Sequence, residues 1–506
     1  MPPTDCVLKL RELSVYRAIL AFAVLITLTI NASLSGQTPA AQASPNANSA
    51  ASGNSAASVN SAANKAAKAA RIEALYQELA EMVPGGVVAG SQTEKSLRAS
   101  VNLIGDQKPL EAQQSLKDLA AADANFPPSD LMLAALAYSI KDNNSGKRLL
   151  EQAAVKNEGY PDVYFSFGQL ALTQQRFTDA EAHAELALQK IQSGSFTQIQ
   201  IDHFKQRYYE IKFQTAKARG KLDAAKQFLK QLESVAPKSP QTLMGKAEMA
   251  FEDNDIDQSL ELLAQLNSLS TGKPQVPQLT IASWFQRRGK TQNADLWIKK
   301  AAAENTDNAN VQIAAAQWSL NREKFAETLR AVKMLESISG ETNLSKEIRA
   351  KVAFAQGAYE MAQEKFESLL TSNPGNIDNA NMLALSMIQS TDEETRKKAL
   401  QLASKVANAQ PNNSIALSSL AYVMLKSGNT DDARSILAKV AQIPNPNAEV
   451  SFIMAYMLSE TGQLPQAKIV LEKVVQTKGL FLFRGEAENL LKSVLQSSQG
   501  LPEPGK

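Results

Sequence analysis

The sequence predicts an all-α solenoid built from about eleven helix-turn-helix units. Small side chains recur about every 34 residues through most of the chain, and a second series of small side chains runs twelve residues ahead of the first. Residues typical of helix ends and helix starts lie between the two series. A two-helix unit of this length cannot bury its apolar face alone, so neighbouring units are expected to stack into one continuous core.

The first series occupies one face of a helix in each unit. In the stretch RFTDAEAHAELAL, Ala180, Ala184 and Ala187 share a face where a core-facing helix usually carries larger residues. Small side chains there let another backbone approach closely. The structural small positions are Ala112, Gly146, Ala180, Ala225, Ser259, Ala294, Thr328, Ala362, Ala399, Ala433 and Ala467. The steps between them are 34, 34, 45, 34, 35, 34, 34, 37, 34 and 34 residues, so the phase survives both long steps.

The second series places another helix at the start of each unit. It reads Ser100, Ala134, Gly168, Ala247, Ala282, Ala316, Ala350, Ala421 and Ala455, with a break at Phe213 and with Ala384 fifteen residues ahead of its partner. A turn joins the two helices. Gly428 and Asn429 end one helix, and Thr430, Asp431 and Asp432 open the next with a cap and first-turn acids.

This pattern resembles the tetratricopeptide repeat (TPR) family over residues 93–478. The residues that match the family motif are the two small residues of each unit, the large apolar residue three positions before the second of them, and prolines near the unit ends. The closest unit, DVYFSFGQLALTQQRFTDAEAHAELAL, has Tyr164, Phe167, Gly168, Phe177, Ala180, Ala184 and Ala187 in the motif positions. Most units lack the Trp and Gly of the family motif. The resemblance implies a right-handed superhelix in which the first helix of each unit lines a concave groove.

The resemblance also implies a binding surface in that groove. The aromatic residues at its groove-facing positions are Tyr138, Phe165, Phe251, Phe354, Tyr422, Phe452 and Tyr456. An apolar groove with aromatic rings suits an extended or helical peptide with hydrophobic anchors. The alternative is that several of these rings only fill the stack. The Lys/Asn/Arg set with which chaperone-binding relatives hold a peptide carboxylate is not seen at matching positions.

Both ends of the array carry candidate capping helices. Residues 65–86 contain AARIEALYQELAEM, which is apolar at helical spacing and ends in PGG. Residues 479–497 contain LFLFRGEAENLLKSVLQ, which we expect to cap the other end, and a disordered tail is expected at 498–506. The eleven-residue excess around residues 193–210 is expected to lengthen one helix or loop.

The N-terminal region has the pattern of an export signal. Lys9, Arg11 and Arg17 precede the apolar run Ala18–Ile30, and small residues follow it. Thirteen helical residues span about 20 Å, short of the ~30 Å hydrocarbon core. Residues 1–36 are therefore predicted to be a signal peptide, and the protein to be exported, periplasmic or secreted. A membrane anchor formed by residues 18–30 is the alternative. Residues 37–64, rich in Ala, Ser and Asn, are expected to be a disordered linker.

The composition provides few residues suited to catalysis or metal binding. The chain has 506 residues, a net charge of +2, two histidines and one cysteine. Near-neutral charge disfavours a nucleic-acid surface, which needs a basic face. Phosphate-loop, zinc-protease and serine-hydrolase motifs do not occur. His183 and His203 are expected on or near the surface. We therefore expect no enzyme activity, no catalytic residues, no cofactor and no metal.

Binding is then the expected class of function. We predict a protein–protein interaction scaffold or adaptor in the cell envelope or secreted space, which takes a peptide or protein partner in the groove. The alternative is a periplasmic chaperone or carrier for exported polypeptide or envelope polysaccharide. A membrane is a partner only if the N-terminal segment stays uncleaved. A scaffold binds one partner stoichiometrically, whereas a chaperone binds many and suppresses aggregation, and the residues do not distinguish the two.

Overall fold

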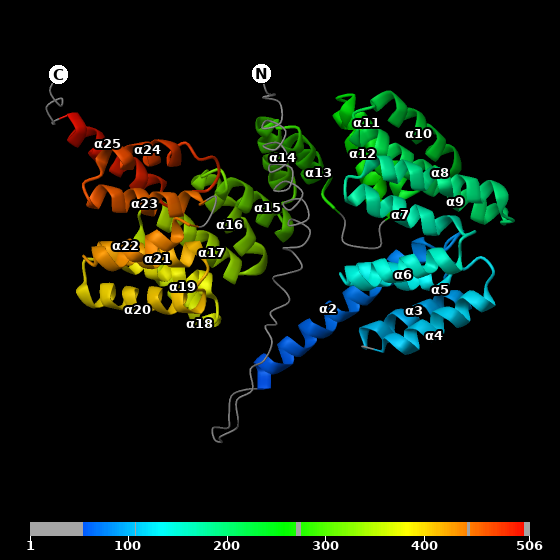
Figure 1. The fold of residues 1–506 in the computed structure, drawn as a ribbon, viewed down its shortest axis with the longest axis horizontal. Helices are drawn as coiled ribbons and strands as arrows, with labels where there is room; N and C mark the ends of the chain where they lie inside the picture. The colour runs from blue at the N-terminus through cyan, green and yellow to red at the C-terminus, as the bar shows by residue number, and fades with distance from the viewer. Residues whose placement is uncertain (1–53, 107, 270–274, 443–445, 500–506) are drawn as a thin grey trace. The chain divides into compact units, whose positions relative to one another are not determined.

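The structure is a computed structural model that describes residues 54–106, 108–269, 275–442 and 446–499. Within these ranges the regular structure is helical throughout, with 24 α-helices labelled α2 to α25 and no strand. The predicted all-α solenoid class is confirmed (Figure 1). The predicted signal peptide, residues 1–36, lies outside the described residues. In the described part of the chain no helix is both long and apolar enough to cross a membrane.

The chain divides into two compact units, residues 1–277 and 278–506. The first unit contains α2 (Asn54–Glu81), α3 (Gln92–Gly105), α4 (Pro109–Ala122), α5 (Ser129–Ser139), α6 (Asn143–Lys156), α7 (Pro161–Thr173), α8 (Phe177–Ser193), α9 (Gln198–Ala218), α10 (Leu222–Val235), α11 (Pro240–Glu252) and α12 (Ile256–Leu269). From α3 onward, consecutive helices pack in pairs, so this unit holds five helix pairs preceded by α2.

The second unit follows the same plan. Its helices are α13 (Pro277–Arg287), α14 (Thr291–Glu304), α15 (Ala309–Leu320), α16 (Phe325–Ser339), α17 (Asn343–Ala355), α18 (Tyr359–Ser372), α19 (Ile377–Met387), α20 (Glu393–Ala409), α21 (Ser414–Lys426), α22 (Thr430–Val440), α23 (Ala448–Glu460), α24 (Leu464–Val474) and α25 (Arg484–Gln499). From α15 to α24, consecutive helices pack in pairs, and α25 follows the last pair and contacts both of its helices. We call the surface formed by the first helices of successive pairs the first-helix face.

Close helix packing explains the small residues. All eleven positions of the first series are buried, and all but Ala294, on α14, lie on the second helix of a pair described above. A Cβ added at Gly168 would lie 3.4 Å from the carbonyl oxygen of Ala180, so the two helices of that pair are almost in backbone contact. Where the small residue is Ser259, its hydroxyl donates to the Ala247 carbonyl at 2.7 Å, which satisfies the buried oxygen.

Tight turns inside the pairs need a left-handed residue just after the first helix. Gly428 has φ +85°, a region that costs glycine nothing. Four such turns use another residue instead, namely Lys141, Gln175, Asn254 and Glu323, with φ between +55° and +67°. A side chain with a Cβ is mildly strained in this region, so these four turns are less relaxed than the glycine turns.

Three boundaries differ from the sequence prediction or sharpen it. The excess near residues 193–210 lengthens α9 to 21 residues. Helix α2 begins at Asn54, so the end of the segment predicted as a disordered linker is helical instead, in keeping with the high helix propensity of its alanines. Helix α25 runs to Gln499 and so includes the first two residues of the predicted tail.

Candidate functional site

The structure separates the seven predicted groove residues into two environments. Phe165, Phe251, Phe354, Tyr422 and Phe452 are almost completely buried, whereas Tyr138 and Tyr456 are partly exposed. The five buried rings fit the alternative that several of the predicted rings only fill the stack, and a role in binding stays a prediction for all seven. In the first unit Phe165 sits in a core cluster with Leu131 and Phe204, because the ring reaches between neighbouring helices.

The four predicted rings of the second unit come together with a fifth. Phe354 from α17, Tyr359 from the start of α18, Tyr422 from α21, and Phe452 and Tyr456 from α23 form what we call the aromatic face. The Tyr422 ring centroid lies 5.4 Å from that of Tyr456 and 6.0 Å from that of Phe452. The Phe354 centroid lies 5.3 Å from that of Tyr359, edge to face. These are favourable aromatic geometries.

The aromatic face is covered by the end of the same chain. We call residues 476–499 the C-terminal segment. Phe483, 2 % exposed, places its ring centroid 5.1 Å from Phe452, 5.2 Å from Phe354 and 5.3 Å from Tyr422. Phe481 is also buried, with its ring 6.2 Å from that of Phe452. The rings expected to face a partner thus contact two phenylalanines that sequence reasoning had assigned only to a cap.

Polar contacts fix this segment in register. The backbone N–H of Phe481 donates to Glu323 Oε1 at 2.9 Å, and Arg484 Nε donates to Glu323 Oε2. The remaining guanidinium nitrogens of Arg484 donate to the carbonyls of Val475 at 2.7 Å and Thr477 at 2.8 Å. One arginine therefore closes the turn of the segment and also pairs with the turn between α15 and α16.

A second carboxylate anchors the start of α25. Glu486 accepts hydrogen bonds from the hydroxyls of Tyr359, at 2.8 Å, and Tyr422. Gln389 Nε2 donates to the Tyr422 hydroxyl at 3.1 Å. Burial, followed by the charge of Glu486, raises the pKa of Tyr422 well above its ordinary value. Burial is also the main cause that raises the pKa of Tyr456 to about 12. Both phenols are neutral donors across the physiological range.

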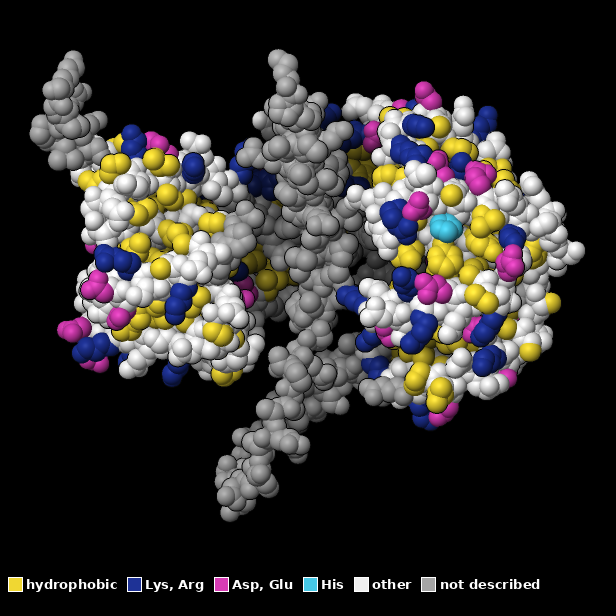
Figure 2. Space-filling model, in the orientation of Figure 1, with side chains coloured by type: hydrophobic (Ala, Val, Ile, Leu, Met, Phe, Trp, Pro, Cys, Tyr) yellow, Lys and Arg dark blue, Asp and Glu magenta, His cyan; other side chains and the backbone are white. Residues whose placement is uncertain are grey.

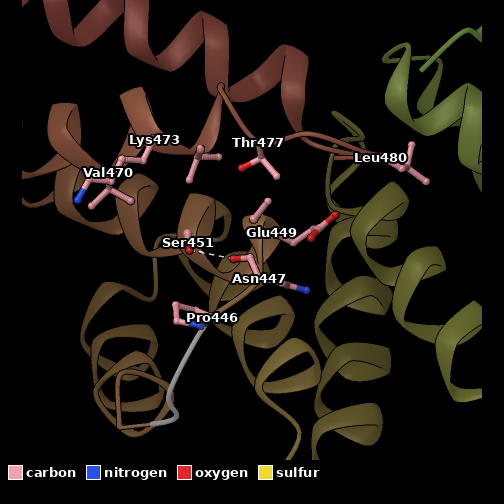
Figure 3. A pocket seen from close by; sticks show the side chains of 10 residues that line it. Pro446, Asn447, Glu449, Ser451, Val470, Lys473, Thr477 and Leu480 are labelled. Carbon is pink, nitrogen blue, oxygen red and sulfur yellow. Dashed lines mark hydrogen bonds between the residues drawn. The ribbon is translucent and has the colours of Figure 1, made fainter. Parts of the chain in front are cut away.

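A cavity of about 490 Å³ lies beneath the start of the C-terminal segment. Figure 3 shows it between the beginning of α23, with Asn447 and Glu449, the end of α24, with Lys473, and the connection at Thr477 and Leu480. Burial raises the pKa of Glu449, although hydrogen bonds from backbone amides, including that of Leu482, oppose the shift. The connection therefore borders open space on one side.

The first unit has its own terminal segment on its first helices. Helix α2 contacts α3 and α5 and buries Leu75, Tyr76 and Leu79. The Arg98 guanidinium on α3 stacks 3.7 Å above the Tyr76 ring centroid and pairs with Glu73 on α2. This helix is the predicted N-terminal capping helix, and like the C-terminal segment it lies across more than one repeat unit.

The first unit also contains a group of charged side chains on α2, α7 and α9. Asp162 is buried; its Oδ2 lies 3.1 Å from His203 Nε2 and its Oδ1 lies 4.0 Å from Arg207 Nε. Burial raises the pKa of Glu210 on α9. Burial and then the charge of Glu210 raise the pKa of Glu81 at the end of α2. Within the described residues no group of three or more His, Cys, Asp or Glu is arranged to hold a metal ion.

The two histidines are packing residues in this structure. His183 stacks on Phe167 with ring centroids 5.4 Å apart, and burial lowers its pKa. His203 pairs with Asp162 and contacts the Phe204 ring. On the face seen in Figure 2, basic and acidic side chains are interspersed over each unit, and hydrophobic side chains appear as scattered patches.

No family model and no curated protein matches the sequence. A tetratricopeptide repeat protein from Parabacteroides merdae is 15% identical and covers 51% of this chain and 98% of its own, with a TM-score of 0.39. Yeast Tom70 is 12% identical and covers 82% of this chain and 98% of its own, with a TM-score of 0.31.

YrrB, described as a TPR protein with an unusual peptide-binding site, is 17% identical and covers 40% of this chain and 97% of its own, with a TM-score of 0.26. At these identities and TM-scores the likeness carries no argument about function. The repeat assignment rests on the paired helices and their 34-residue spacing. The described chain is a helical repeat solenoid, and tetratricopeptide repeat proteins are the solved structures to which it is similar.

Proposed function

We propose that this chain is a non-enzymatic interaction scaffold that binds a protein or peptide partner on the first-helix face of its solenoid. One observation carries the proposal: the aromatic face of the second unit already holds a polypeptide segment. Two phenylalanines are buried there, and one carboxylate pairs with both an amide and a guanidinium. Buried aromatic anchors surrounded by matched polar contacts are the chemistry by which proteins recognise peptides.

We place this scaffold in the cell envelope or the secreted space. The support is the basic flank and the short apolar run Ala18–Ile30, followed by small residues. The mature chain is then expected to begin between about Gly36 and Ser44, as a signal peptidase requires small residues at the cleavage site. N-terminal sequencing of the protein from cell fractions tests this. An intact Met1 on membrane-bound material would indicate the anchor formed by residues 18–30.

Site-specific cross-linking tests the binding face. A photo-reactive residue at Tyr456, a partly exposed ring of the aromatic face, should cross-link to one partner in living cells. The same residue at Tyr138 probes the first unit. Val155 is the matched control, because it is 84% exposed on α6, the second helix of its pair.

The pattern of cross-links separates the classes of function. One partner in stoichiometric amount at Tyr456 or Tyr138, absent at Val155, supports a scaffold. A ladder of many polypeptides, together with suppressed aggregation of an unfolded client, would instead support the chaperone or carrier. Equal cross-linking at all three positions would contradict binding through the first-helix face.

A further inference from the structure

The C-terminal segment makes contacts of the kind that a bound peptide makes. Phe481 and Phe483 are buried on the aromatic face, while Leu482 between them is only partly buried. Arg484 follows directly and pairs with Glu323. These four residues therefore present a short linear pattern: two buried rings separated by one residue, and then a guanidinium.

Glu323, the solenoid residue that pairs with the segment, has a backbone conformation that is unfavourable for a residue with a Cβ. Glu323 has φ +55°, whereas the corresponding turn residues Gly357, Gly428 and Gly462 of later pairs are glycines with positive φ. Glycine would relax this turn. The carboxylate at position 323 is the one group that receives both the Phe481 amide and the Arg484 guanidinium.

The connection to the segment is loosely packed. Residues 475–480 join the last repeat to the two buried phenylalanines and are exposed or partly exposed, whereas α25 beyond them packs on α24 and α23. Figure 3 shows Thr477 and Leu480 of this connection at the edge of the cavity, whose volume is about 490 Å³. Removing the segment would expose Phe354, Tyr422 and Phe452 together with the carboxylate of Glu323, and this combination defines what could replace it.

We propose that the aromatic face binds a partner segment in which two large apolar side chains, separated by one residue, are followed directly by arginine, and that the C-terminal segment occupies this site in cis until the partner displaces it. This inference rests on the proposed scaffold function and adds the partner's chemistry and a competition for the site. While the site is covered, the apparent affinity for a partner is reduced by the fraction of molecules in which it is open.

The first experiment releases the segment without changing the wall of the site. Full-length protein with Phe481→Ala and Phe483→Ala is mixed with a fluorescent peptide of residues 479–489, GLFLFRGEAEN. The double variant should bind this probe at least about tenfold more tightly than the wild-type chain, because its site is open. A peptide in which both phenylalanines are alanine should not bind. Hydrogen exchange of residues 480–497 reports the release, and exchange in α15 to α20 reports that the repeats stay folded.

The second experiment removes the anchor on the solenoid while relieving its turn. Glu323→Gly should speed exchange in the C-terminal segment but leave the α15–α16 turn at least as protected as before, because glycine suits φ +55°. Added to the double variant, it should weaken peptide binding by about tenfold. The matched control is Gln175→Gly, at φ +58° in an exposed turn of the first unit, which should change neither result.

Three results would overturn the inference. The segment of the double variant could remain fully protected, the released variant could fail to bind the peptide, or the wild-type chain could bind it equally well. A wild-type dimer that the double variant cannot form would assign the aromatic face to a second copy of the chain. A cellular cross-link at Tyr456 without peptide binding would reject the proposed motif but not the scaffold function. Peptide binding without any cellular partner would support the motif and reject the scaffold function.

Discussion

Each unit carries an additional segment on its first helices, α2 in the first unit and the C-terminal segment in the second, but the two contacts differ in chemistry. In the second unit the contact is made by rings, and the carboxylates of Glu323 and Glu486 each meet hydrogen-bond donors. In the first unit Glu81, at the end of α2, meets the charges of Glu210 and Glu78 and the opposing charge of Arg207. Both contacts bury apolar side chains, and they differ in the surroundings of their carboxylates: Glu323 and Glu486 accept hydrogen bonds, whereas Glu81 meets both like and opposite charges.

The largest difference should appear when the central ring of one contact is removed. Phe483→Ala deletes the side chain that touches Phe354, Tyr422 and Phe452, and such buried truncations cost about 3–5 kcal/mol. Hydrogen exchange should rise in α21, α23 and α25 and stay unchanged in the first unit. Equal loosening of both units would contradict their independence.

One substitution made in both units should have opposite consequences. Tyr422→Phe removes a hydroxyl that donates to the charged Glu486, at a cost of about 1.5–3 kcal/mol. Tyr138→Phe removes a buried hydroxyl without a hydrogen-bond partner, so it should be neutral or slightly stabilising. Urea unfolding of full-length variants, followed by unit-resolved hydrogen exchange, measures both. A similar loss in the two variants would show that the Glu486 contact contributes little.

The small positions test what the two units share. Ala433→Leu and Ala180→Leu each force three extra heavy atoms into a fully buried site, and overpacking of this kind costs about 1–3 kcal/mol. The loss of protection from Ala433→Leu should spread to the flanking repeats around Ala399 and Ala467 and not to the first unit. Unchanged protection after both substitutions would contradict the 34-residue register.

The smallest effect should be a difference in pH dependence. The raised pKa values of Glu81 and Glu210 mean that the folded state holds their protons more tightly than the unfolded state does. The stability that this linkage supplies is complete below the ordinary value of 4.5 and is lost as the pH rises through the raised values. Protection at the end of α2 should therefore fall as the pH rises above 4.5.

A matched pair of variants isolates this effect. Glu210→Gln should flatten the fall in the first unit. Glu449→Gln should do the same, to a smaller extent, for the second unit, where burial raises the pKa of that one carboxyl beside the C-terminal segment. Exchange rates corrected for their intrinsic pH dependence give the slopes. A slope in the first unit that Glu210→Gln leaves unaltered would assign the dependence to other groups.

The sequence predicted the four rings of the second unit but not what they touch. Phe354, Tyr422 and Phe452 all lie against Phe483, and Tyr422 also lies against Tyr456. Among the four, Tyr422 and Tyr456 are 34 residues apart, at equivalent positions of successive units. The aromatic pair in LFLFRGEAE, which matches no repeat position, was the available signal that the chain end does more than cap. Helical periodicity alone cannot say whether a ring faces water or another segment.

The sequence by itself determined the repeats, the register and the paired helices of this protein. Those features depend on contacts within a unit and between neighbours, so they leave a periodic trace such as the series from Ala112 to Ala467. The tertiary structure alone decided what covers the aromatic face. The contact between Phe481 and Glu323 joins residues 158 positions apart, and that between Tyr359 and Glu486 joins residues 127 apart. Such contacts arise only when the folded repeats bring distant surfaces within reach of a chain end, so no local pattern encodes them.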